Sequence, residues 1–204
     1  MKRIANEKWL LDSEWQVQVG FNLPFAICNL PFEIGGVRMA ELIYLSLGSN
    51  MGERQEYMSF AVKRLSEQPG MLFLRKSSLY LTEPWGEPDQ DSFYNAVVEL
   101  QTTSLPWELL SQCHQIEREA GRERKVHWGP RVLDIDILWY GGQHIATGDL
   151  LVPHPYLAER LFVMRPLAEL EPQLEIPLRG RLDLLLEAYH GTEKVELICT
   201  PQEW

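Results

Sequence analysis

Apolar and polar residues alternate in four short segments, and apolar residues recur at helical spacing in two longer ones. Alternation predicts strands over residues 41–47, 71–81, 93–102 and 133–138, because successive side chains on a strand point to opposite faces. Helical spacing predicts helices over residues 53–68 and 105–121, each bounded by proline or glycine. The order β-α-β-β-α-β predicts an α+β fold, a ferredoxin-like sandwich with two helices on one face of an antiparallel sheet.

The C-terminal part of the chain continues less regularly. Gly141-Gly142 ends the last of these strands, and the sequence Val-Pro-His-Pro follows at residues 152–155. A short helix is expected near residues 157–161, followed by a leucine-rich tail. We interpret these segments as C-terminal additions to a single domain that spans residues 39–204.

Residues 1–38 contain many apolar residues but no period of 2 or 3.6. We expect that they are not part of the natural protein. Gly35-Gly36 can be encoded as a purine-rich ribosome-binding sequence, and two codons separate it from Met39. The segment would then be an upstream leader read in frame. The alternative is a real N-terminal extension whose aromatic residues pack on the domain.

Deleting residues 1–38 distinguishes these two interpretations. A chain that starts at Met39 is expected to keep its melting temperature and its activity, because the predicted first strand begins almost at once. A fall of more than ~5 °C, or roughly 1–2 kcal/mol for a domain of this size, would show that the extension belongs to the fold. The intact mass of the protein from its native cell tests the start site itself.

Composition limits the classes of protein that the chain can represent. The 204 residues are 45% hydrophobic, which is enough for one ordinary core. The net charge of −10 argues against a general nucleic-acid or membrane surface, so any phosphate must bind at a local basic cluster. Cys28, Cys113 and Cys199 are odd in number and widely spaced, which suggests neither a disulfide framework nor a zinc site. This cysteine pattern fits a reducing cytoplasm best, and no apolar run reaches membrane-spanning length.

The candidate chemistry lies in residues 127–138. Asp134 and Asp136 alternate with apolar residues, so both carboxylates lie on one face of a strand, about 6–7 Å apart. Two like charges this close repel unless one is protonated or a cation lies between them. Carboxylate oxygens select Mg²⁺ or Mn²⁺, which usually arrives with substrate phosphates.

Basic residues beside the acids favour phosphoryl transfer. Arg131 lies three residues before Asp134, and Gly129-Pro130 predicts a turn that fixes Arg131 at a junction between loop and strand. Guanidinium groups there would hold phosphate oxygens while the acids hold metal. The alternative is a solvated strand face in which the acids form salt bridges with nearby arginines.

Several further motifs occur in a fixed order around this segment. They are Leu-Gly-Ser-Asn at 47–50, Ser-Ser-Leu-Tyr-x-Thr-x-Pro at 77–84, Phe-Tyr-Asn-Ala at 93–96, Gly-Arg-x-Arg at 121–124, Trp-Gly-Pro-Arg-x-x-Asp-x-Asp at 128–136 and Val-Pro-His-Pro at 152–155. Together they strongly resemble the 6-hydroxymethyl-7,8-dihydropterin pyrophosphokinases of folate biosynthesis, from about residue 42 to about residue 174. An Asp-x-Asp alone is weak, whereas the ordered series is highly specific.

The resemblance implies that the chain transfers an intact pyrophosphoryl group from ATP to the primary hydroxyl of the pterin and releases AMP. It also implies that Asp134 and Asp136 are the metal ligands and hold two Mg²⁺ ions. The implied catalytic residues are Arg122, Arg131, Asp134 and Asp136. The implied ATP-binding residues are Arg122, Arg124, Arg131, His154 and Arg160. The implied pterin-binding residues are Thr82, Phe93, Asn95 and Phe162.

These residue types suit the implied ligands on physical grounds. Forked guanidinium groups bind a triphosphate better than lysine does. A flat heterocycle with amide edges is best held by stacked aromatic rings and an in-plane carboxamide, such as Asn95. A structural role for His154 remains open, as does a core position for Phe93. Glu117 and Trp128 also match motif positions, but the sequence does not indicate a catalytic role for either.

The chain departs from the family at three positions: Glu83 replaces a common proline, Phe93 a frequent tyrosine, and His127 a frequent arginine. Two other functions remain open. One is a ferredoxin-like binding module that has lost catalysis, although both aspartates are present. The other is a metal-dependent transferase such as a glycosyltransferase, which the lack of a doubly wound nucleotide-binding half argues against. A monomer is expected, with no nucleic-acid or membrane partner.

Overall fold

The structure, a computed structural model, describes residues 33–34, 37–84, 90–121 and 130–204. The chain divides into two units, residues 1–30 and residues 31–204. The first unit lies outside the described residues, so the interpretations of the N-terminal segment stay predictions. At the start of the described part, β1 (Glu33–Ile34) and β2 (Val37–Arg38) form a short antiparallel pair.

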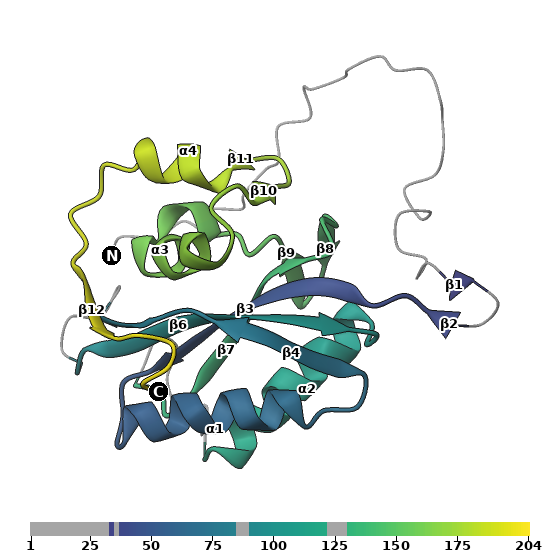
Figure 1. The fold of residues 1–204 in the computed structure, drawn as a ribbon, viewed down its shortest axis with the longest axis horizontal. Helices are drawn as coiled ribbons and strands as arrows, with labels where there is room; N and C mark the ends of the chain where they lie inside the picture. The colour runs from purple at the N-terminus through teal and green to yellow at the C-terminus, as the bar shows by residue number, and fades with distance from the viewer. Residues whose placement is uncertain (1–32, 35–36, 85–89, 122–129) are drawn as a thin grey trace, which may run out of the picture. The chain divides into compact units, whose positions relative to one another are not determined.

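The second unit is built on a six-stranded antiparallel sheet (Figure 1). Its strands are β3 (Glu41–Ser49), β4 (Met71–Lys76), β5 (Leu79–Thr82), β6 (Phe93–Thr102), β7 (Asp134–Tyr140) and β12 (Val195–Cys199). The strand order is β12-β5-β6-β3-β7, and β4 pairs with β6. This confirms the α+β class with an antiparallel sheet and helices. It also places β7, which carries the aspartates, at one edge.

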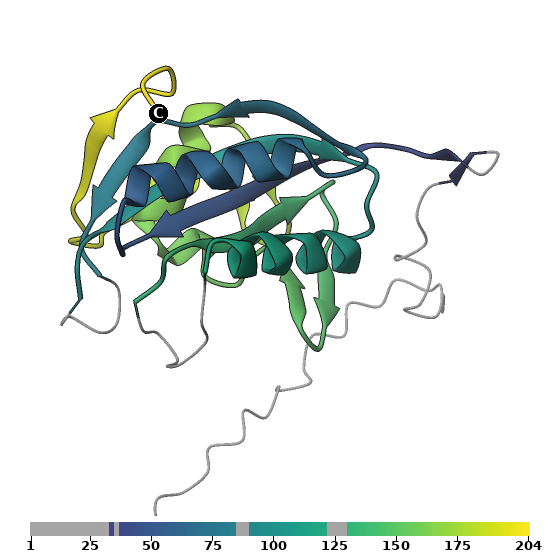
Figure 2. The ribbon, with the colours of Figure 1, turned by 90° about the horizontal axis from the view of Figure 1, so that it is seen from below.

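Two helices cover one face of the sheet, as the apolar spacing predicts. α1 (Arg54–Ser66) and α2 (Pro106–Glu119) lie side by side across it (Figure 2). α2 begins with proline in its first turn, and the Glu108 carboxylate accepts a hydrogen bond from the backbone N–H of Leu105, 2.7 Å away. In the core on this face, alternate residues of the strands pack against the apolar residues of the two helices. The strand residues include Leu45, Leu47, Ile135 and Ile137, and the helix residues include Met58, Leu65, Leu109 and Ile116.

A second core lies on the opposite face of the sheet. α3 (Leu161–Leu170) follows a single 3-10 turn (Leu157–Glu159), and α4 (Leu182–Glu187) packs beside it (Figure 1). Val163, Met164 and Leu167 of α3 pack with the sheet residues Tyr44, Val97 and Leu138.

One expectation about regular structure was wrong. The predicted strand 71–81 is two strands, β4 and β5, and at the break between them the hydroxyl of Ser77 accepts a hydrogen bond from the N–H of Val97 (2.9 Å). The short helix expected near residues 157–161 is present as a 3-10 helix (Leu157–Glu159), which the longer α3 follows. The hairpins β8 (Ile145–Thr147) with β9 (Leu150–Val152) and β10 (Glu175–Ile176) with β11 (Gly180–Arg181) were not predicted.

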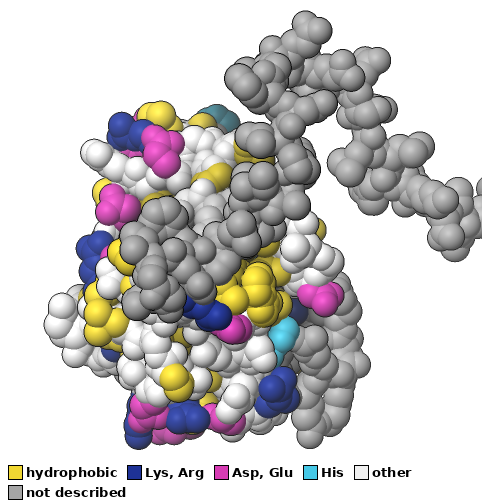
Figure 3. All heavy atoms as spheres, turned by 90° about the vertical axis from the view of Figure 1, so that its right-hand side faces the viewer, with side chains coloured by type: hydrophobic (Ala, Val, Ile, Leu, Met, Phe, Trp, Pro, Cys, Tyr) yellow, Lys and Arg dark blue, Asp and Glu magenta, His cyan; other side chains and the backbone are white. Residues whose placement is uncertain are grey.

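The described surface and cysteines have the following properties. On the face seen in Figure 3, the described acidic and basic side chains are interspersed and form no broad basic area. Cys113 and Cys199 are free thiols, whereas Cys28 lies outside the described residues. Within the described part of the chain, no helix is both long and apolar enough to cross a membrane.

Candidate active site

Strand register brings the predicted polar residues to one part of the sheet. Gly48 on β3 is opposite Asn95 on β6 and opposite Asp134 on β7. Two residues back along β3, Ser46 is opposite Asp136. Because residues opposite each other on paired strands share a face, both acids and the amide lie on the α3 side of the sheet.

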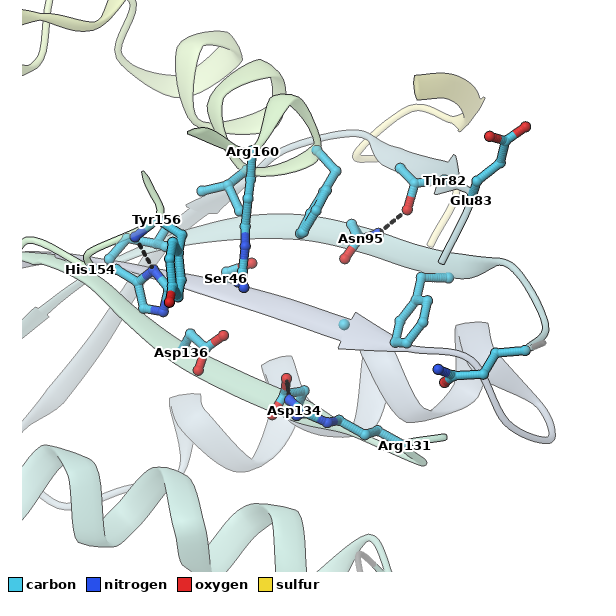
Figure 4. Close-up of a pocket in the computed structure, with 16 residues that line it drawn as sticks. Ser46, Thr82, Glu83, Asn95, Arg131, Asp134, Asp136, His154, Tyr156 and Arg160 are labelled. Carbon is cyan, nitrogen blue, oxygen red and sulfur yellow. Dashed lines mark hydrogen bonds and ion pairs between the residues drawn. The ribbon is translucent and has the colours of Figure 1, made fainter. Parts of the chain in front are cut away.

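These residues open onto one hollow beyond the first turn of α3, with a volume of about 370 Å³ (Figure 4). Every predicted site residue within the described ranges lines it: Thr82, Phe93, Asn95, Arg131, Asp134, Asp136, His154, Arg160 and Phe162. Arg122, Arg124, His127 and Trp128 lie outside the described residues, so the expectations for them are untested. The chain thus brings together residues from β5, β6, β7 and α3 that are far apart in sequence.

Asn95 and Thr82 form the uncharged side of the hollow. Asn95 is only 4% exposed, and its Nδ2 donates a hydrogen bond to Thr82 Oγ1, 2.7 Å away (Figure 4). Gly48 lies beside this amide, and a Cβ atom there would lie 3.3 Å from Asn95 Oδ1, a close contact that the carboxamide would have to shift to relieve. The bond to Thr82 fixes the plane of the carboxamide, so the amide is oriented before any ligand binds.

The charged side of the hollow holds the acids and two arginines. Arg131 forms an ion pair with Asp134, which compensates one of the two negative charges. Arg160 enters from the start of α3 (Figure 4) and lies over the rings of Tyr156 and Phe162, at 4.8 and 5.7 Å from their centroids. Burial lowers the pKa of Arg160, while Asp136 and Asp134 raise it. The acids therefore help keep this guanidinium charged inside the hollow.

His154 reaches the same side in its neutral form. Burial lowers its pKa to about 4, and the nearby Arg160 adds to the effect. Its Nδ1 accepts a hydrogen bond from the backbone N–H of Tyr156, 3.3 Å away. A neutral imidazole that accepts at Nδ1 carries its proton on Nε2, so His154 presents a hydrogen-bond donor rather than a positive charge.

A second hollow, of about 300 Å³, lies along β7 and shares Arg131, Asp134, Asp136 and His154 with the first. Its other walls are mixed: Leu110, Ile135, Ile137, Leu150 and Leu151 are apolar, whereas His114, Glu117 and Asp149 are polar. Because β7 is an edge strand, ligands can reach the acids from both hollows. Two ligands could therefore meet at the aspartates.

Comparisons with known proteins place this chain in a family. The family model described as 7,8-dihydro-6-hydroxymethylpterin-pyrophosphokinase (HPPK) matches residues 44–172. The chain belongs to this family. Its relatives include the pyrophosphokinase of Bacillus subtilis, 46% identical over 137 residues that make up 67% of this chain and 82% of that protein. The pyrophosphokinase of Pseudomonas aeruginosa is 39% identical over 159 residues, 77% of this chain and 98% of that protein.

Solved HPPK-DHPS structures share the fold. The crystal structure of HPPK-DHPS in complex with substrates matches with a TM-score of 0.60 and 13% identity, over 74% of this chain and 43% of that one. Plasmodium falciparum HPPK-DHPS matches with a TM-score of 0.59 and 15% identity, over 74% of this chain and 46% of that one. The chain spans less than half of these longer proteins, and at such identities the likeness concerns the fold alone.

Some residues of this HPPK-family site were not predicted. Ser46, Glu83, Gln90 and Tyr156 also line the first hollow. Strand parity could have found Ser46, which shares a face with Gly48. Glu193, from the segment before β12, accepts a hydrogen bond from the backbone N–H of Leu161 at the start of α3, 2.8 Å away. No local signal in the sequence indicates that contact.

Glu117 lines the second hollow. The sequence alone did not indicate a role for it. It is 2% exposed, and its Oε1 accepts a hydrogen bond from the backbone N–H of Ile135, 2.9 Å away. Ile135 lies between the two aspartates on β7. The buried carboxylate therefore holds the edge strand at the point where both acids project.

Proposed function

We propose that the chain transfers diphosphate from ATP to the hydroxymethyl group of 6-hydroxymethyl-7,8-dihydropterin and releases AMP, a step of folate biosynthesis. One observation carries the proposal: a buried amide, two carboxylates and two guanidinium groups open onto the same hollow. Family membership supports it, since the relatives of Bacillus subtilis and Pseudomonas aeruginosa carry the name of this pyrophosphokinase.

The pterin is proposed to occupy the uncharged side of the first hollow. Phe93 and Phe162 offer ring faces for stacking, and Asn95 offers both a donor and an acceptor to the amide-like edge of the heterocycle. Thr82 holds the Asn95 carboxamide through the 2.7 Å hydrogen bond. In this orientation the hydroxymethyl group would point towards the charged side.

ATP is proposed to lie in the second hollow, with its base against the leucine side chains of that hollow and its triphosphate over the aspartates. Arg131, Arg160 and the Nε2 proton of neutral His154 would then contact phosphate oxygens. Arg131 pairs with Asp134 before ligands bind, so it would exchange that carboxylate for a phosphate oxygen. Arg122 and Arg124 are proposed as further phosphate ligands from the sequence motif alone.

Asp134 and Asp136 fit Mg²⁺ as ligands, since both are carboxylates that line the two hollows. Among the described residues, no group of three or more His, Cys, Asp or Glu forms a complete metal site. Two carboxylates agree with an ion that takes its remaining ligands from water and phosphate. When bound, Mg²⁺ would neutralise the negative charge that develops between the β-phosphorus and the departing AMP.

The chain's own residues would mainly position the reactants. Two ligands that meet beside the shared residues Asp134 and Asp136 would bring the pterin hydroxyl and the β-phosphorus together, which replaces a bimolecular encounter by a fixed geometry. The guanidinium groups stabilise negative charge on the transferred group. A dedicated general base is not required for this type of transfer.

Two finer statements belong to the same proposal. The sheet order β7-β3-β6-β5 and the position of α1 and α2 support a ferredoxin-like βαββαβ core with C-terminal additions. A cytoplasmic monomer is proposed in agreement with the free thiols and the interspersed surface charges.

Measuring AMP release tests the proposed activity. The purified chain, with ATP and Mg²⁺, is expected to release AMP only when hydroxymethyl-dihydropterin is present. A binding module without catalysis would bind the pterin and release no AMP. A transferase for another acceptor would leave AMP release independent of the pterin.

A further inference from the structure

We infer that Asn50 is a positioning residue that couples the pterin side of the hollow to the phosphate side; the inference rests on the proposed function. Asn50 follows β3 directly and ends the Leu-Gly-Ser-Asn motif. It is 2% exposed and is not among the residues that line either hollow. Its effect on a ligand would therefore pass through the residues that it holds.

The first residue that Asn50 holds is Arg131. The backbone N–H of Asn50 donates to the carbonyl oxygen of Arg131 at 3.0 Å, and Asn50 Oδ1 accepts from the backbone N–H of Arg131 at 2.7 Å. These two bonds join the residue just past the end of β3 to the loop that leads into β7. They fix the backbone of the residue whose guanidinium pairs with Asp134.

The second partner is the segment that leads into β6. Asn50 Nδ2 donates to the side-chain oxygen of Gln90 and to the carbonyl oxygen of Asp91, each at 3.2 Å. Gln90 lines the first hollow, and the next residues carry Phe93 and Asn95 to the pterin side. One buried side chain thus bonds to the segments that supply both halves of the site.

Only certain side chains can make both connections. The Arg131 partner is an N–H donor and the Asp91 partner is a carbonyl acceptor, so the orientation of the Asn50 amide is unambiguous. A carboxylate of the same shape can still accept from Arg131 but cannot donate to Asp91. Gln90 can turn its own amide, but the Asp91 carbonyl cannot become a donor. Asn50→Asp therefore disrupts one connection selectively, and Asn50→Ala removes both side-chain connections.

The two variants are expected to give different kinetic results. Asn50→Asp should raise KM for the pterin about tenfold, with kcat and KM for ATP changed by no more than about threefold, because the Arg131 side keeps its acceptor. Asn50→Ala should also lower kcat about tenfold, because the backbone of Arg131 then loses a hydrogen bond. If Asn50→Ala does not fold, the isosteric Asn50→Asp is tested alone.

Gln112→Ala is the matched control. Gln112 is a partly buried amide on α2 whose Nε2 donates to Ser104 Oγ at 3.2 Å, and it lines neither hollow. It is expected to leave both KM values and kcat unchanged. Asn50 variants that lower the melting temperature but match Gln112→Ala in KM and kcat would overturn the inference. Wild-type chain without pterin-dependent AMP release would instead overturn the proposed function, so the two failures are distinguishable.

Discussion

Replacing Asp134 or Asp136 with alanine is expected to lower turnover by roughly three orders of magnitude, since a metal ion contributes several kcal/mol to a phosphoryl-transfer barrier. Both carboxylates line the hollow from β7, and their strand is held from the other face by buried Ile135 and Ile137. The variants should therefore keep the fold. AMP release measures turnover, and thermal melting confirms the folded state.

Asp183→Ala provides the control for this prediction. Like Asp134, Asp183 pairs with an arginine close in sequence, Arg181, but it lies on α4 and lines neither hollow. Its loss should leave turnover unchanged. Activity of an Asp134 or Asp136 variant within about tenfold of the wild type, a barrier change of only ~1.4 kcal/mol, would contradict the metal-ligand role.

Asn95→Ala and Arg131→Ala are expected to separate the two halves of the site. Loss of the Asn95 amide should raise the pterin requirement roughly 10- to 100-fold and change the ATP requirement little, since buried hydrogen bonds contribute about 1–3 kcal/mol. Arg131→Ala should impair ATP use and kcat instead, because a guanidinium contacts phosphate rather than the heterocycle. Calorimetric titration of each variant with the pterin and with an ATP analogue measures the two affinities directly.

Tyr80→Phe is the control for Asn95→Ala. Tyr80 lies opposite Asn95 on β5, but its hydroxyl bonds to Glu169, 3.1 Å away, rather than opening into the hollow. This variant should leave both affinities unchanged. Loss of affinity for the same ligand in Asn95→Ala and Arg131→Ala would show that the division into a pterin side and a phosphate side is wrong.

The sequence predicted the parts of the fold that depend on local periodicity. Alternation located β3 and β6 closely and placed Asp134 and Asp136 on the face opposite Ile135 and Ile137, because strand parity is fixed by backbone geometry. The family motifs located the candidate residues, and every one within the described ranges lines the first hollow. What they do chemically remains a proposal.

The features that were missed depend on contacts between distant segments. β12 exists because residues 195–199 add to the edge of β5, and Glu193 meets the start of α3 only after that pairing. Pro166 lies inside α3, where a proline usually indicates a helix end, and burial against the sheet outweighs that preference. The roles of Asn50 and Glu117 in holding β7 likewise required knowledge of which backbone groups lie opposite them.

A crystal structure of the chain with Mg²⁺, a non-hydrolysable ATP analogue and hydroxymethyl-dihydropterin tests the central claim most directly. The account predicts a pterin ring between Phe93 and Phe162 with its edge on Asn95, and Mg²⁺ bound by Asp134 and Asp136 beside the triphosphate. The pterin hydroxyl should face the β-phosphorus beside the carboxylates of Asp134 and Asp136. A pterin bound outside the first hollow, or a triphosphate whose metal does not contact the two aspartates, would contradict it.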